Sequence, residues 1–344
     1  MKIIYLIRAY DNKFGGAEQY LSRLSKVLAK QNISHKVVNS IFPKFLPSWL
    51  SAILFNLQVC LIKRDKFYFS LDRVSCPDVY RAGDGVHKVF LGIENKSRLN
   101  PLHPVYLFLE RRCFNNSKRI IANSQLIKNQ IINTYGIAPS KIDVVYNGVE
   151  LKDFDYQASF AKLSQEFLIG NKQKILLYVG SGFKRKGVEE FLQIVSRLKG
   201  HNIRAFIVGK DKKIKYYQQM AKELSIDDIV IFTGPRNDVD DFYAISDIFL
   251  FPTHYEPFSN VVLEAMNFNN AVFTTRQNGA CEILDSEFIM SSPRDLSVVE
   301  KIDKLFLDKK TLQRVQDNNR SKSQEFSIER NLSETLKVID EVIN

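Results

Sequence analysis

The stretch FPTHYEPFSNVVLEA, residues 251–265, decides how the rest of the sequence is interpreted. It follows an apolar run, residues 248–251, which predicts a buried strand. Pro252 ends that strand, because proline is excluded from the interior of a sheet. Ser259 or Asn260 can cap the helix that the next apolar residues predict. The stretch is therefore a strand, a loop and the start of a helix.

Two glutamates occupy this unit. Glu256 is expected in the loop, and Glu264 about two turns into the helix. A helix N-terminus attracts anions through its free N–H groups and its partial positive charge. A sugar nucleotide offers a diphosphate to that end and hydroxyl groups to the carboxylates. The alternative is a solvated glutamate pair on an ordinary strand–helix unit, since charged residues are mostly exposed.

Length and composition indicate a globular chain of two domains. The sequence has 344 residues, of which 45% are hydrophobic and 25% charged. The cysteines show no C-x-x-C spacing, which argues against a disulfide framework or a zinc site and favours a reducing cytosol. They are Cys60, Cys76, Cys113 and Cys281.

Charge is concentrated in the first half of the chain. Residues 1–150 contain 22 Lys and Arg against 10 Asp and Glu, whereas residues 151–344 contain 27 against 28. A basic half favours an anionic partner, either nucleic acid or anionic lipid. Residues 88–118 are basic with interleaved aromatics, which we interpret as a membrane-facing surface. The apolar run 46–62 is short for a membrane span and predicts a helix, with a membrane surface as one place where it could lie.

Both halves begin with the same pattern of an apolar run, a glycine loop and a helix. In the first half these are residues 2–7, 12–16 and 17–24, and in the second 174–179, 180–187 and 188–195. The repetition predicts two Rossmann-like α/β domains, which we place at residues 1–165 and 166–325. Further strands are expected at residues 36–39, 67–71, 119–122, 143–146, 205–209, 229–233, 248–251 and 271–274.

The motif P-x-x-x-E-P-F-S-N-V-V-L-E-A, together with Lys184-Arg185-Lys186-Gly187, resembles the signature of retaining glycosyltransferase family 4. The matching motifs run from the N-terminus to about residue 285. The resemblance implies the GT-B fold, in which two Rossmann-like domains face a central cleft. It also implies that a terminal helix, residues 326–344, packs back on the first domain.

The resemblance assigns roles to residues of the second domain and of the first loop. Glu264 would bind the ribose, Glu256 the transferred hexose, and Arg185 with Lys186 the diphosphate. Gly15 and Gly16 would lie against the sugar and diphosphate, because glycine lets the backbone approach a ligand. The remaining nucleotide contacts would come from two loops: Arg236, Asn237, Val239, Phe258, Ser259 and Asn260.

The segment D-V-Y-x-A-x-D, residues 78–84, resembles lipopolysaccharide core glucosyltransferases that extend the inner-core heptose. The resemblance places Asp84 beside the reacting sugar. His87 departs from that subgroup, although other members of the family have a catalytic-site histidine in the first domain. Without the resemblance, both residues fit an ordinary turn.

These features predict a retaining hexosyltransferase that uses UDP-glucose or UDP-galactose. Its acceptor would be a lipopolysaccharide core or another lipid-linked glycan, and it would lie on the cytoplasmic face of the inner membrane. No metal cofactor is expected, because Arg185 and Lys186 supply the positive charge that a metal would otherwise provide. No nucleic acid partner is expected either. The alternatives are a non-catalytic basic binding protein on a degenerate Rossmann scaffold and a GT-B epimerase.

Overall fold

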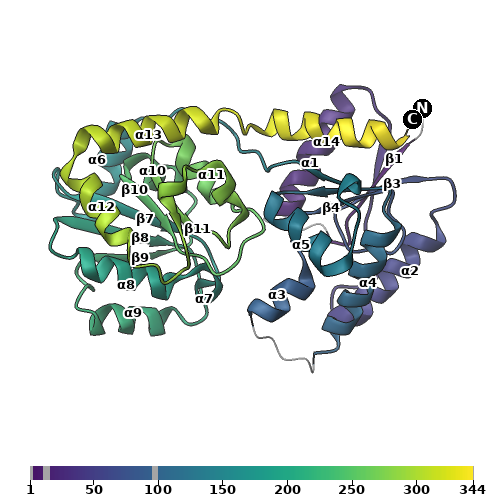
Figure 1. Ribbon diagram of the computed structural model, residues 1–344, viewed down its shortest axis with the longest axis horizontal. Helices are drawn as coiled ribbons and strands as arrows, with labels where there is room; N and C mark the ends of the chain where they lie inside the picture. Colours follow the sequence, from purple (N-terminus) through teal and green to yellow (C-terminus); the bar gives the residue numbers. More distant parts are fainter. Residues whose placement is uncertain (1–2, 11–15, 95–99, 344) are drawn as a thin grey trace. The chain divides into compact units, whose positions relative to one another are not determined.

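A computed structural model describes residues 3–10, 16–94 and 100–343. The chain divides into two compact units (Figure 1): unit 1 is Met1–Tyr146 with Glu329–Asn344, and unit 2 is Asn147–Ile328. The division therefore comes earlier than the predicted boundary at residue 165. The reason is helix α6 (Tyr156–Phe167), which packs on unit 2: its Ser159 hydroxyl donates to Asp241 at 2.7 Å, and its Phe167 ring lies 5.8 Å from that of Phe242.

Unit 1 contains a parallel sheet whose strands lie in the order β2-β1-β3-β4-β5-β6. The strands are β1 (Ile4–Ile7), β2 (His35–Val38), β3 (Phe67–Ser70), β4 (Val79–Ala82), β5 (Arg119–Ala122) and β6 (Ile142–Val144). The helices around it are α1 (Gly16–Lys30), α2 (Ser48–Leu61), α3 (His87–Ile93), α4 (Leu102–Asn116), α5 (Gln125–Tyr135) and α14 (Ile328–Ile343), with a 3-10 turn at Pro139–Lys141.

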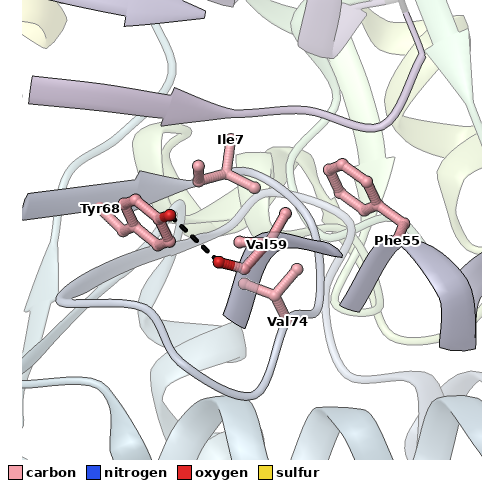
Figure 2. Packing of buried hydrophobic residues seen from close by; sticks show 5 residues of the cluster. All are labelled: Ile7, Phe55, Val59, Tyr68 and Val74. Atoms are coloured by element: carbon pink, nitrogen blue, oxygen red, sulfur yellow. Dashed lines mark hydrogen bonds between the residues drawn. The ribbon is translucent and has the colours of Figure 1, made fainter. Parts of the chain in front are cut away.

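Helix α2 is fixed to the sheet by a buried cluster (Figure 2). Phe55 and Val59 of α2 pack with Ile7 of β1 and Tyr68 of β3, and Val74 closes the cluster. The Tyr68 hydroxyl also donates to the Val59 carbonyl at 3.1 Å, so its burial leaves no polar group unpaired. One face of α2 is thereby held. Within the described ranges, no helix is both long and apolar enough to cross a bilayer.

Unit 2 contains a second parallel sheet, in the order β12-β11-β10-β7-β8-β9. Its strands are β7 (Lys174–Val179), β8 (Ile203–Val208), β9 (Val230–Gly234), β10 (Ile248–Phe251), β11 (Ala271–Thr275) and β12 (Ile289–Met290). Its further helices are α7 (Phe183–Lys186), α8 (Val188–Leu198), α9 (Ile214–Glu223), α10 (Val239–Ile245), α11 (Asn260–Asn267), α12 (Val298–Leu307) and α13 (Lys309–Ser323), with 3-10 turns at Gly279–Ile283 and Ser286–Phe288.

The two-sheet α/β prediction is confirmed, and three predicted strands match residue for residue: β5, β7 and β10. Strand β4 was missed, because no strand was predicted between residues 71 and 119. It has only four residues, all buried, and one of them is Arg81, whose guanidinium stacks 3.9 Å from the centre of the Tyr20 ring. A buried charge of this kind breaks the apolar run by which parallel strands are recognised.

The expectation of no disulfide was wrong, because Cys60 and Cys76 form one. Cys60 is near the end of α2 and Cys76 lies in the loop between β3 and β4. The docking of α2 on β3 brings their Cα atoms to 5.8 Å, a relation that sequence spacing does not reveal. Since disulfides are rare in a reducing cytosol, the cysteines no longer support that compartment.

Helix α14 belongs to unit 1 although unit 2 precedes it in the chain. The hydroxyls of Thr335 and Tyr20, on α1, are hydrogen-bonded at 2.8 Å, and the Asn331 amide donates to the Tyr146 carbonyl at 2.5 Å. Glu341 also lies 3.4 Å from Arg119.

Candidate active site

The glycine loop after β7 places two basic side chains at the carboxyl end of the unit 2 sheet. Gly182 and Gly187 flank α7 with φ of 81° and 80°, a left-handed conformation that favours glycine. At Gly187 a Cβ atom would lie 1.9 Å from the Pro252 carbonyl oxygen. The loop is therefore in direct backbone contact with the residue that follows β10.

Arg185 and Lys186 of this loop converge on one carboxylate. Arg185 Nη1 lies 2.5 Å from Glu256 Oε1, and Lys186 Nζ lies 3.4 Å from the same oxygen. Arg185 Nη1 also donates to the Tyr255 carbonyl at 2.6 Å. We refer to Arg185, Lys186 and Glu256 as the basic cluster. Two cations and one anion leave it with a net positive charge, which suits a diphosphate.

Tyr178 of β7 lies beside the basic cluster and was not predicted. Its hydroxyl is fully buried and has no hydrogen-bond partner among the described residues. Burial raises the pKa of Tyr178 well above its ordinary value, and the charge of Glu256 raises it further. The hydroxyl therefore remains a neutral donor. The sequence signal was one polar atom inside the apolar run that follows Lys174 in β7.

Three residues that sequence reasoning missed, Thr253, His254 and Glu190, support the backbone of Arg185. The Thr253 hydroxyl and the His254 N–H both donate to the Arg185 carbonyl, at 3.1 and 2.9 Å. His254 Nε2 in turn lies 2.9 Å from the carboxylate of buried Glu190 on α8. Burial acts to raise the pKa of Glu190, but the hydrogen bond and charge of His254 outweigh it, and the pKa is lowered. Thr253 and His254, which lie between Pro252 and Glu256, thus position the glycine loop that carries Arg185 and Lys186.

Glu264 lies on α11, as predicted. Its Oε2 accepts a hydrogen bond from the Tyr243 hydroxyl at 3.1 Å. Burial and the nearby charge of Glu264 raise the pKa of Tyr243 well above its ordinary value, so the tyrosine remains a donor. This bond fixes one carboxylate oxygen of Glu264.

The start of α11 is built by its preceding loop. Ser259 is the N-cap residue but makes no side-chain capping bond; its N–H donates to Asn278 Oδ1 at 3.2 Å. Asn260 accepts from the Asn147 amide at 2.8 Å, and Phe258 is buried. Phe258 therefore serves the core, whereas Ser259 and Asn260 lie at the helix end.

The loop after β9 carries Arg236, Asn237 and Val239. The guanidinium of Arg236 is occupied by two carboxylates: it contacts Asp238 at 2.8 and 2.9 Å, and Glu166 at 2.7 and 2.9 Å. The hydrogen bonds to Arg236 lower the pKa of Asp238 well below its usual range. Asn237 is exposed, and Val239 begins α10. A ligand would meet the backbone of this loop rather than a free Arg236.

The aspartates near this loop pair with lysines. Lys162 lies 2.6 Å from both Asp238 and Asp241, and Lys152 lies 2.6 Å from Asp240. Among the described residues no three or more His, Cys, Asp or Glu side chains are grouped as a metal site.

In unit 1, Asp84 and His87 follow β4, around a buried Arg73–Glu110 ion pair. Arg73 Nε donates to Glu110 Oε1 at 3.0 Å, and Arg73 Nη1 lies 3.9 Å from Asp84. The Asp84 side chain is 61% exposed, so it faces solvent with one oxygen near a cation. Tyr135 donates to the other oxygen of Glu110 at 2.6 Å. Glu110 was not predicted, because nothing in its sequence neighbourhood distinguishes it.

His87 begins α3, and its N–H donates to Glu110 Oε1 at 2.7 Å. Its ring Nε2 lies 3.2 Å from Nδ1 of His103. Burial, together with the charges of Arg73 and His103, lowers the pKa of His87 to about 4. His87 is thus neutral at physiological pH. Of the predicted glycines, Gly16 is the first residue of α1, and Gly15 lies outside the described residues.

Two family models match the chain. "Glycosyl transferases group 1" matches residues 159–322, and "Glycosyltransferase Family 4" matches residues 84–153. The first match includes the basic cluster and Glu264, and the second begins at Asp84.

Curated relatives include glycosyltransferases of bacterial surface polysaccharides. The capsular polysaccharide biosynthesis glycosyltransferase CapM of Staphylococcus aureus is 30% identical over 59% of this chain and 56% of its own length. The lipopolysaccharide glucosyltransferase WaaG of Escherichia coli K12 is 29% identical over 58% of this chain and 55% of its own length. The matched part thus spans about half the length of these relatives.

Solved structures match over nearly the whole chain. The crystal structure of WaaG, a glycosyltransferase involved in lipopolysaccharide biosynthesis, aligns with a TM-score of 0.81 at 20% identity and covers 98% of this chain and 99% of that one. Anabaena Alr3699/HepE in complex with UDP aligns with a TM-score of 0.74 at 19% identity, covering 99% and 100%. These likenesses establish the fold. Together with the family models and the curated relatives, they show that the chain belongs to the GT-B glycosyltransferases and is related to the lipopolysaccharide core glucosyltransferases.

Proposed function

We propose that the chain is a retaining hexosyltransferase that moves glucose or galactose from a UDP-sugar to a lipopolysaccharide core or other lipid-linked glycan. The observation that carries the proposal is the basic cluster. It joins two cations to a carboxylate at the carboxyl end of a parallel sheet, where α/β proteins bind nucleotides.

The donor would bind to unit 2. Arg185 and Lys186 would take the diphosphate, Glu264 the ribose hydroxyls and Glu256 the hexose hydroxyls. The base would lie against the backbone of residues 236–239, because Arg236 is already bound by carboxylates. Relatives of the same fold support UDP as the nucleotide, since Alr3699/HepE has been solved with UDP and with UDP-glucose.

Transfer with retention would proceed on one face of the hexose. The bond between the anomeric carbon and the phosphate oxygen breaks while the acceptor oxygen bonds to the same carbon. The leaving phosphate takes the acceptor proton, so no protein nucleophile is required. Arg185 and Lys186 would stabilise the charge that grows on the phosphate, a role that a metal otherwise fills. Asp84 would act near the anomeric carbon, and neutral His87 would serve as a hydrogen-bonding group.

The acceptor would bind to unit 1, on the cytoplasmic face of the inner membrane. Curated relatives named for lipopolysaccharide and for an undecaprenol-linked sugar support an acceptor of this class. Unit 1 also exposes large apolar side chains: Phe45, which is next to Lys44 in the sequence, Leu57 and Leu61. Apolar side chains flanked by cations suit the surface of an anionic bilayer.

A thermal-shift screen of the full chain against UDP-, GDP- and ADP-sugars tests the proposal. A ligand at about one hundred times its Kd stabilises the folded state by about 2.7 kcal/mol. We expect the largest shift with UDP-glucose or UDP-galactose, unchanged by EDTA, and slow hydrolysis of the same donor. A chain that responds to no nucleotide sugar, but binds anionic vesicles or DNA, would instead be a basic binding protein.

A further inference from the structure

Unit 1 has a cavity of about 330 Å³ at the carboxyl end of its own sheet. Arg8 follows β1, Arg73 follows β3 and Asp84 follows β4, and all three line it. The first turns of α2 form the opposite wall. This is the edge at which open parallel sheets bind ligands, and its lining residues belong to unit 1, whereas the proposed donor site belongs to unit 2.

The α2 wall has the features of an anion site. The first turn of α2 contains no acidic residue, and its N-cap residue, Pro47, offers no side-chain capping bond. Ser51 lines the cavity and is only 7% exposed, yet its hydroxyl has no hydrogen-bond partner in the described part of the chain. A buried hydroxyl without a partner is costly unless a ligand satisfies it. Lys44 stands on the same wall, with Nζ 5.8 Å from the centre of the Tyr10 ring.

The charges on the sheet wall are balanced. It presents the carboxylates of Asp72 and Asp84 beside two arginines: Arg8 Nη1 lies 2.8 Å from Asp72, and Arg73 Nη1 lies 3.9 Å from Asp84. Paired carboxylates still accept hydrogen bonds from sugar hydroxyls, and their charge offsets the attraction of the two arginines for an anion. A suitable ligand therefore has hydroxyls at one end and a negative charge at the other.

We propose that this cavity is the acceptor subsite, and that the acceptor sugar carries an anionic group, a phosphate or a carboxylate, which lies against the N-terminus of α2. The proposal rests on the proposed function, because it specifies the acceptor of that reaction. The hydroxylated ring of the acceptor sugar would lie between the anionic group and Asp84, which we propose to act beside the reacting carbon.

The test uses calorimetry on the full chain with four probes: glucose, glucose 6-phosphate, glucuronate and inorganic phosphate. At least one charged sugar should bind about tenfold or more tightly than glucose, which corresponds to one charge-assisted hydrogen bond. The charged sugar that binds more tightly identifies the group. Inorganic phosphate that binds as tightly as glucose 6-phosphate would overturn the sugar assignment.

Three variants locate the site. Lys44→Gln and Ser51→Ala should each weaken the charged sugar about fivefold and leave glucose unchanged. Ser48→Asp places a carboxylate in the first turn of α2, where it stabilises the helix, so it should abolish the preference while the fold is retained. Lys66→Gln is the matched control, because Lys66 also stands over a tyrosine ring, 5.2 Å from the centre of Tyr5, but does not line the cavity.

UDP is titrated into the same samples. Normal UDP binding with no preference for a charged sugar overturns the subsite and leaves the proposed function intact. The other informative outcome is a chain that binds no nucleotide but prefers a charged sugar, with a preference that Lys44→Gln removes. That outcome supports the cavity as an anionic-sugar site and overturns the proposed transferase function.

Discussion

Substitution of Gly187 by alanine tests the close contact between Gly187, which follows Arg185 and Lys186, and Pro252 at the end of β10. Two costs add at this position. A left-handed backbone disfavours any Cβ by about 1–2 kcal/mol. The new atom would also lie 1.9 Å from the Pro252 carbonyl oxygen, and overpacking of this kind costs about 1–3 kcal/mol. Unit 2 should therefore lose about 2–5 kcal/mol of stability.

Gly182→Ala is the matched control. Gly182 has nearly the same φ, 81° against 80°, but a Cβ atom there would have nothing within 4 Å. The control should lose about 1–2 kcal/mol, from backbone strain alone. The difference between the two variants isolates the contact with Pro252.

Urea unfolding can assign the loss to unit 2. Trp49, the single tryptophan of the chain, lies in unit 1, so its fluorescence reports that unit, whereas far-UV circular dichroism reports both. We expect Gly187→Ala to shift the circular dichroism transition and to leave the Trp49 transition in place. UDP affinity should also fall, because the contact lies next to the residues that hold Arg185. Equal destabilisation by the two alanines would refute the reasoning.

Three other outcomes are expected. Glu264→Ala should weaken UDP binding by about 1.5–3 kcal/mol, the value of hydrogen bonds to a charged acceptor, and unchanged affinity in calorimetry would exclude the ribose assignment. Asp84→Ala should lower kcat much more than donor affinity, since a charge beside the reacting carbon acts mainly on the transition state; normal turnover would remove Asp84 from the site. The chain should pellet with anionic vesicles but not with neutral vesicles or duplex DNA, and Leu61→Asp should weaken that binding. Leu168→Asp in unit 2 is the control, with exposures of 81% for Leu168 and 78% for Leu61, and equal losses in both variants would contradict a surface on unit 1.

The sequence predicts the elements whose signals are local. Strands β5, β7 and β10 were located because each is a short run in which apolar residues predominate, and α11 because a capping residue precedes it. The glycine loop was located for the same reason: its glycines and basic residues are adjacent in the chain.

What the sequence could not predict depends on contacts between distant residues. The role of His254 became visible only through Glu190, 64 positions away along the chain. Glu110 gained its importance from Arg73, and Cys60 gained a partner when α2 packed on β3. In each case an ordinary side chain acquires its role from a neighbour that the fold supplies.

Because α14 belongs to unit 1, the two units cannot complete their folding in the order in which they are synthesised. A ribosome synthesises the whole of unit 2 before it reaches α14, yet Thr335 and Asn331 complete unit 1. Unit 2 is contiguous and can fold as soon as it emerges, while residues 1–146 wait with the surface that α14 covers still open to water. During that interval unit 1 exposes part of its core. Since exposed apolar surface promotes aggregation, unit 1 is the unit that we expect to need a chaperone more during synthesis.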